Sequence, residues 1–110
     1  MVYLVNAFSV SMLNLTAGDA GLLTVRRVEL AEARRWCKPG EADVKSAIGH
    51  ADTANVVASL LGIPVQVNRV NIELVPGDWL VLAQYSGPRL PEGTTTLPAG
   101  AEIRWYLISI

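Results

Sequence analysis

The stretch SAIGHADTANVVASLLG, residues 46–62, decides the fold. Its second half repeats apolar side chains at the i, i+3, i+4 and i+7 spacing of one helix face, at Ala54, Val57, Ala58 and Leu61. Asp52 or Thr53 is the expected N-terminal cap of this helix, and Gly62 ends it. The first half indicates the end of a strand, followed by a turn at Gly49. The stretch therefore predicts a strand that passes through a glycine turn into an amphipathic helix.

Short apolar and β-branched runs surround this helix and predict strands. They cover residues 2–8, 22–28, 44–48, 65–74, 79–85 and 102–110. Residues 30–36 suit a short helix that Lys38-Pro39-Gly40 ends, and residues 9–13 suit a turn or a single helical turn. The segments 65–74 and 79–85 are expected to form a hairpin, with a bulge near Asn68 and Arg69 where the apolar phase slips. The prediction is a single α/β domain over residues 1–110, with a mixed central sheet of about five strands flanked by helices.

Composition excludes several classes of protein. The 110 residues are 51% hydrophobic and carry a net charge of −1, so we expect one folded domain and no binder of long nucleic acid. No apolar run approaches the roughly 18 residues of a membrane span, and a soluble, cytoplasmic protein is expected. Cys37 and His50 are the sole cysteine and histidine, which excludes an intrachain disulfide and a structural zinc site. The sequence implies no metal and no other cofactor.

His50 is the first candidate for chemistry. It lies between a strand end and a helix start, where free backbone N–H groups favour an anion such as phosphate. A histidine in this place can donate a proton to a leaving oxygen near neutral pH. The alternative interpretation, a partly exposed capping histidine without chemistry, stays open on the pattern alone.

The predicted loop over residues 86–100 carries the second group of candidates. Its length is unusual for a small domain, and such loops are often functional lids. Arg89 and Glu92 lie three residues apart in it, close enough to act on one ligand. Arginine can bridge phosphate oxygens, and glutamate can orient a histidine or accept a hydroxyl proton. A surface ion pair between the two is the alternative.

Polar and charged side chains elsewhere give weaker signals. Ser9 and Ser11 follow the first strand, where they are suited to a ligand but also common as turn residues. Arg69 falls inside an apolar run, which favours an internal ion pair with an acidic residue. The remaining arginine cluster is expected to be a solvated face, at Arg26, Arg27, Arg34 and Arg35. The three tryptophans are expected in the core, at positions 36, 79 and 105.

Five motifs in order resemble one known family. They are Asn6-Ala-Phe-Ser9-x-x-Met12-Leu13, Ala47-Ile-Gly-His50-x-x-Thr53, Asn68-Arg69-Val70, Gly77-Asp78 and Arg89-Leu-x-Glu92-Gly93. Together they look like the small ring nucleases of viruses and mobile elements, type III anti-CRISPR proteins that degrade cyclic tetra-adenylate. The resemblance covers residues 2–93. The spacing departs from the family pattern by one extra residue between Gln84 and Arg89, and the chain is shorter beyond Gly93.

The resemblance implies a metal-independent homodimer with cyclic tetra-adenylate on its two-fold axis. It implies four catalytic residues, with His50 as general acid beside Arg89, Glu92 and Ser9. It also implies candidate substrate-binding residues at Asn6, Ser11, Arg69 and Gln84. The ribose 2′-hydroxyl of the substrate would serve as nucleophile and leave a 2′,3′-cyclic phosphate. The alternatives are a non-catalytic binder of cyclic oligonucleotides and a structural or interaction protein of a virus.

Overall fold

The computed structural model describes residues 1–38 and 44–110 and confirms a mixed α/β fold. The sheet formed by these residues has five strands in the order β2-β5-β4-β1-β3. The strands are β1 (Val2–Val5), β2 (Thr24–Val28), β3 (Val44–Ser46), β4 (Trp79–Ser86) and β5 (Glu102–Ser109). β1 is parallel to both of its neighbours, β3 and β4, whereas β5 is antiparallel to β4 and β2.

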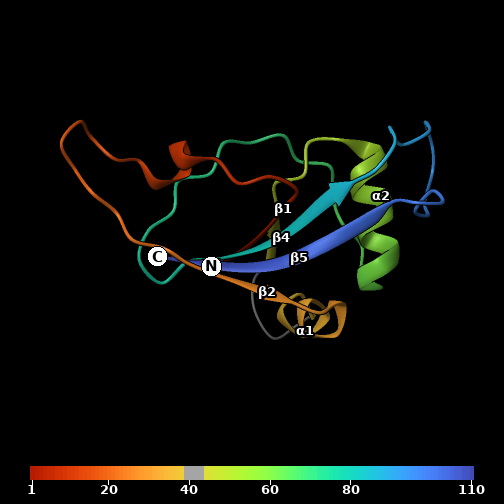
Figure 1. Cartoon of the computed structure of the whole chain (residues 1–110), viewed down its shortest axis with the longest axis horizontal. Coiled ribbons are helices and arrows are strands. Elements are labelled where there is room, and N and C mark those ends of the chain that lie inside the picture. Colours follow the sequence, from red (N-terminus) through yellow and green to blue (C-terminus); the bar gives the residue numbers. More distant parts are fainter. Residues whose placement is uncertain (39–43) are drawn as a thin grey trace.

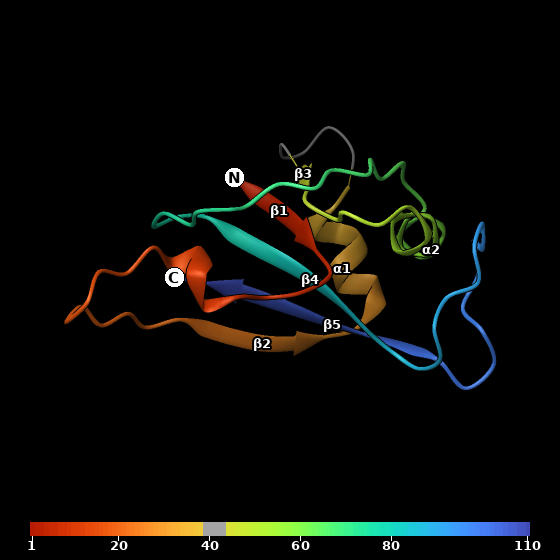
Figure 2. The ribbon, with the colours of Figure 1, turned by 90° about the horizontal axis from the view of Figure 1, so that it is seen from above.

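Two hydrophobic clusters pack against opposite faces of the sheet, because successive side chains of a strand point to opposite sides. The first joins β-strand residues such as Leu4 and Val81 to α1 (Leu30–Trp36) and α2 (Ala51–Leu61). The second gathers Val5 and Leu82 under the 3-10 helix η1 (Val10–Leu13) and the segment 72–74. Figure 1 shows α1 on one side of the sheet and η1 on the other, and Figure 2 shows the same sheet from above.

The N-cap of the central helix α2 lies two residues before Asp52, the first of its two predicted caps. His50 is its N-cap residue, without a hydrogen bond from its side chain, so the expected capping role of Asp52 or Thr53 is wrong. Asp52 instead lies within the first turn. Gly62 ends the helix with a positive φ of 72°, as predicted. The predicted helix over 30–36 is confirmed, with Cys37 as its C-cap, whereas Pro39 and Gly40 lie outside the described residues.

The predicted hairpin is wrong. Residues 65–74 contain one isolated bridge, in which Val67 pairs with Ile48 in parallel, and no regular strand. β4 already has β1 on one edge and β5 on the other, so no edge is left for a hairpin partner. The segment still buries Ile72 and Leu74, which explains its strand-like apolar alternation. Without a strand there is also no bulge near Asn68 and Arg69.

Other element boundaries differ by a few residues. β1 ends at Val5 rather than at residue 8, β2 starts at Thr24 rather than at residue 22, and β3 ends at Ser46 rather than at residue 48. The predicted long loop and final strand are present, with β4 continuing through Ser86 before the loop begins. Among the described residues, no helix is long and apolar enough to cross a membrane.

Candidate functional site

The carboxyl ends of the parallel strands β1, β3 and β4 meet at one edge of the sheet. Leu4 pairs with Ser46 on one side and with Val81 on the other, which fixes the register of all three strands. Ligands of open α/β sheets bind beyond such carboxyl ends. Figure 1 shows α2 and the loop after β4 (light blue) together at this end of the sheet. The sheet therefore directs the segments that follow these strands toward one region.

His50 is held by a short, well-anchored connection between β3 and α2. The N–H of Ala47 donates to the carbonyl of Leu4 over 2.9 Å, and the side chain of Ile48 is completely buried. The carbonyl of Ile48 then accepts the N–H of Asn68 over 2.8 Å. His50 itself is exposed at the first cap position of α2. A well-anchored backbone thus presents the exposed imidazole of His50 to solvent.

A pocket of about 610 Å³ at the start of α2 brings together three of the predicted catalytic residues. It is lined by His50, Ala51, Asp52, Arg89, Leu90, Pro91 and Glu92. An adjoining hollow of about 250 Å³ shares four of these residues and adds Thr53 and Tyr85. His50, Arg89 and Glu92 are all exposed, and no ion pair joins Arg89 to Glu92 in the described part of the chain. An imidazole, a guanidinium and a carboxylate therefore face one open space.

The loop that carries Arg89 and Glu92 is attached at two points. At its base, the hydroxyl of Tyr85 donates a hydrogen bond to the carbonyl of Pro88. Farther along, the N–H of Gly93 donates to Asp52 Oδ1 over 2.9 Å. The sequence did not identify Asp52 or Tyr85 as site residues. The one signal in the sequence was the acidic side chain of Asp52, two positions after His50, and this side chain was interpreted as the cap of the predicted helix.

Arg69 approaches the same turn from the irregular segment. A Cβ atom added to Gly49 would lie 3.2 Å from the Cβ and Nε atoms of Arg69, so the arginine packs directly over this glycine. The expected internal ion pair is wrong, because Arg69 is exposed and has no salt bridge among the described residues. Asn68 supports the segment by donating its side-chain amide to the carbonyl of Ser46 over 2.7 Å. Arg69 therefore lies next to the residue that precedes His50.

The remaining predicted residues do not line the His50 pocket. The hydroxyls of Ser9 and Ser11 are 2.9 Å apart at the start of η1, where Ser9 also accepts the N–H of Ser11. Asn6 directly follows β1 and is half-buried. Gln84 lines a separate hollow of about 300 Å³ with Tyr85, Ser86 and Arg104. Within one chain, His50, Arg89 and Glu92 thus line one pocket, and these four polar residues do not line it.

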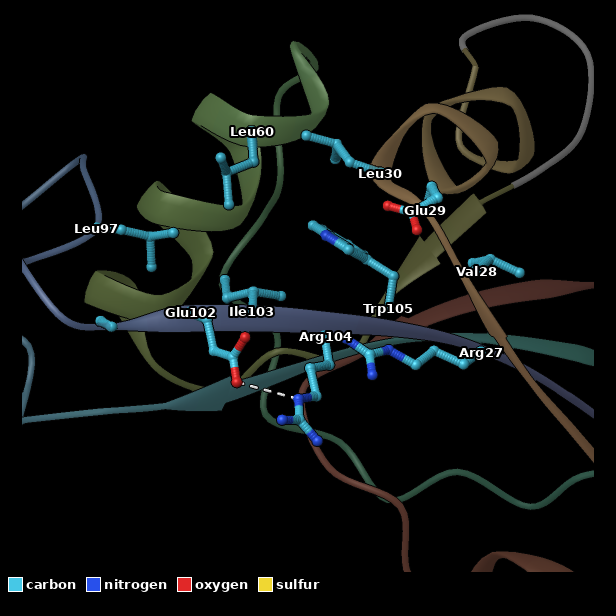
Figure 3. Close-up of a pocket in the computed structure, with 11 residues that line it drawn as sticks. Arg27, Val28, Glu29, Leu30, Leu60, Leu97, Glu102, Ile103, Arg104 and Trp105 are labelled. Atoms are coloured by element: carbon cyan, nitrogen blue, oxygen red, sulfur yellow. Dashed lines mark hydrogen bonds and ion pairs between the residues drawn. The ribbon is translucent and has the colours of Figure 1, made fainter.

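A further hollow, of about 290 Å³, lies between the two helices and β5. Figure 3 shows apolar side chains that line it, among them Leu30, Leu60, Leu97, Ile103 and Trp105. Glu102 and Arg104 form an exposed ion pair at its rim, with 3.0 Å between Nε and Oε1. None of the predicted site residues lines this hollow.

The arginine cluster of β2 and α1 is exposed, which confirms the prediction of a solvated face. Arg26 makes a bidentate ion pair with Glu32, at 2.7 and 3.1 Å, and these hydrogen bonds lower the pKa of the Glu32 carboxyl. Arg34 donates to the carbonyl of Leu60. Of the tryptophans, Trp105 is buried, whereas residues 36 and 79 are half-buried and contact each other, with ring centroids 4.7 Å apart and a tilt of 39° between the rings. No group of three His, Cys, Asp or Glu side chains suited to a metal ion occurs in the described ranges.

Comparison with known proteins finds relatives in viruses and in a bacterium. The family model described as STIV B116-like matches residues 2–104. The solved structure of B116 of Sulfolobus turreted icosahedral virus has a TM-score of 0.79 and 28% sequence identity, and the match covers 99% of this chain and 98% of that one. Proteins of viruses are thus among the relatives, in line with the viral part of the sequence-based expectation.

Two curated relatives match over shorter ranges. The uncharacterized protein ORF117 of Acidianus two-tailed virus is 36% identical over 69 residues, which are 63% of this chain and 58% of that protein. The uncharacterized protein YddF of Bacillus subtilis is 34% identical over 56 residues, which are 51% of this chain and 52% of that protein. The matches therefore span little more than half the length of each curated relative.

Proposed function

The chain belongs to the STIV B116-like family, and we propose that it is a metal-independent ring nuclease. Its proposed substrate is cyclic tetra-adenylate, and its proposed role is to switch off type III CRISPR signalling as an anti-CRISPR protein. The observation that carries this proposal is the pocket that His50, Arg89 and Glu92 share at the start of α2. A proton donor, a phosphate-binding cation and a carboxylate can together supply the acid, the charge stabilisation and the base for cleavage of a ribonucleotide phosphodiester.

The proposed reaction is an internal transesterification. The ribose 2′-oxygen forms a bond to the adjacent phosphorus, and the bond from phosphorus to the 5′-oxygen breaks. His50 donates a proton to the departing 5′-oxygen, and Arg89 stabilises the charge that develops on the phosphate. The proton of the 2′-hydroxyl passes to Glu92, or to a water molecule where Glu92 instead orients the imidazole. Two such cuts convert the ring into linear di-adenylates that end in a 2′,3′-cyclic phosphate.

The start of α2 supports binding of a phosphate in this pocket. The helix has 11 residues, and the side chain of its N-cap residue, His50, makes no capping hydrogen bond to the N–H groups of the first turn. These N–H groups and the positive end of the helix dipole attract anions. Arg89 lines the same pocket and Arg69 packs over Gly49 beside it, which adds two cationic side chains. The helix N-terminus and these two arginines oppose the negative charge of Asp52 and Glu92, which line the same pocket, and they are the groups to which we assign phosphate binding.

A homodimer is part of the proposal, because a ring with repeating bonds presents equivalent groups to two identical half-sites. Asn6, Ser9, Ser11 and Gln84 do not line the His50 pocket of their own chain, so the proposal assigns them to the ring between two copies. Val10, Leu15, Leu22 and Val25 are exposed on the N-terminal half, and we assign the contact between copies to this part of the chain. The oligomeric state in solution, measured by light scattering, tests this part.

Cleavage of labelled cyclic tetra-adenylate in EDTA tests the proposed function. The wild-type chain should open the ring, and His50→Ala should lower the rate at least about a hundredfold, the usual scale for loss of a general acid. Asn55→Ala is the matched control, since Asn55 is exposed on the same helix and outside the pocket.

Two results would contradict the enzyme. A ring that binds but stays intact for many hours makes the chain a non-catalytic binder. A ring that neither binds nor is cleaved favours a structural or interaction protein.

A further inference from the structure

We propose that Asp52 is a positioning residue that holds the loop segment with Arg89 and Glu92 against the start of α2. The proposal rests on the proposed function of the same pocket. Its central observation is the hydrogen bond of 2.9 Å from the N–H of Gly93 to Asp52 Oδ1, which joins residues 41 positions apart. A carboxylate acceptor makes this bond stronger than a bond between neutral groups.

The Asp52 bond acts together with the attachment at the loop base. The hydroxyl of Tyr85 donates to the carbonyl of Pro88, one residue before Arg89. Gly93, the partner of Asp52, directly follows Glu92. Residues 89–92 therefore lie between two attached points, and both loop residues of the proposed reaction belong to this span. Loss of either attachment would leave the span held at one end.

The local conformation suits Gly93 as the donor. Its φ is +79°, a value that L side chains rarely adopt, and an added Cβ would meet nothing within 4 Å. The N–H of Thr94 also closes a turn onto the carbonyl of Pro91 over 3.2 Å. The turn and the positive φ together present the Gly93 amide to the helix. A glycine at this position thus serves the backbone geometry rather than side-chain packing.

Asp52 is assigned to positioning rather than to substrate contact because of its charge. A carboxylate that faces a phosphate repels it, and Asp52 lines the pocket in which the phosphate is proposed to bind. Its Oδ1 atom is already engaged by the Gly93 amide. An acidic residue in the first turn of a helix also interacts favourably with the helix dipole. The side chain can therefore hold the loop without being a ligand.

Hydrogen exchange at the Gly93 amide tests the contact without substrate. Asp52→Ala removes the acceptor and should accelerate exchange of this amide about tenfold, the scale of one hydrogen bond. Asp52→Asn keeps an acceptor oxygen and should stay within about threefold of wild type. Asn55→Ala is the control on the same helix and should leave the exchange unchanged. Equal exchange rates in Asp52→Ala and wild type would overturn the contact.

Cleavage kinetics test whether the contact between Asp52 and Gly93 matters for the proposed reaction. Asp52→Ala should lower kcat for cyclic tetra-adenylate about ten- to a hundredfold, because a misplaced group loses rate on this scale, while Asp52→Asn rescues most of the loss. Faster exchange at Gly93 with unchanged kcat would overturn the positioning role. An inactive wild-type chain would overturn the proposed function, and the exchange experiment would still decide whether Asp52 holds the loop.

Discussion

The two sides of the His50 pocket are built in different ways. On the helix side, His50 follows the completely buried Ile48, and α2 buries Ala54 and Val57 against the sheet. On the loop side, most residues between 87 and 100 are exposed, and hydrogen bonds at Tyr85 and Asp52 attach the segment with Arg89. The first side is fixed by core packing, whereas the second depends on a few local bonds.

This difference assigns separate tasks to the two sides. Segments with few buried contacts open at a low free-energy cost, and ligand-binding loops are drawn from them. A proton donor on a fixed backbone and a cation on a weakly attached loop would allow the loop to adjust around a bulky ring. Changes on the helix side should therefore alter the stability of the whole domain, and changes on the loop side should alter the site locally.

The largest effect on stability is expected from Ile48→Ala. Its side chain is completely buried two residues before His50, so the substitution leaves a cavity and should cost about 2–5 kcal/mol in the free energy of unfolding. Leu90→Ala on the loop side, where the side chain is half-buried, should cost about 1 kcal/mol or less. Denaturant unfolding measures both values. Equal costs would remove the distinction between the two sides.

Two glycines of the loop should respond differently to alanine. Gly87 has a φ of +147°, and an added Cβ would lie 2.8 Å from the Cβ of Ala101. Gly87→Ala should therefore distort the loop base at a cost of about 3 kcal/mol. Gly93→Ala meets open space and should cost about 1 kcal/mol, from its positive φ alone. Thermal unfolding compares them, and a larger loss for Gly93→Ala would contradict the assigned packing at the loop base.

The smallest expected effect is a pH dependence of the free energy of unfolding that comes from the buried thiol of Cys37. Burial raises the pKa of the Cys37 thiol from 9.0 to about 11, so the folded chain keeps its proton when the unfolded chain has lost it. The free energy of unfolding should thus fall as pH rises from 9 toward 11, by less than about 1 kcal/mol at pH 9.5. Cys37→Ala should abolish this part of the slope. An identical slope in Cys37→Ala and wild type would show that the thiol does not contribute.

The sequence predicted those parts of the fold that short-range patterns control. The period of Ala54, Val57 and Leu61 identified α2, and the positive φ of its terminal glycine agrees with the predicted end. The hairpin failed because strand pairing is a long-range property: both edges of β4 are occupied, and Ile72 and Leu74 are buried without a ladder. Apolar alternation reports burial, and it does not report which partner provides the burial.

The candidate site could also be predicted only where its residues are close together in the sequence. His50 could be placed because a strand, a glycine turn and a helix are adjacent in the sequence. That it lines one pocket with Arg89 is a long-range contact that no local pattern fixes. The bond between Asp52 and Gly93 could not be foreseen, since 41 residues separate them and Asp52 had a sufficient local explanation as a cap.

The most direct test of this account is a titration of cyclic tetra-adenylate into the isotope-labelled His50→Ala chain, followed by NMR. The variant keeps Arg89 and should bind the ring without cleaving it. A site shared by helix and loop predicts chemical-shift changes both at the first turn of α2, around Asp52, and along residues 89–93 of the loop. Changes confined to one of these segments, or the absence of changes at saturating ligand, would contradict a shared site between helix and loop.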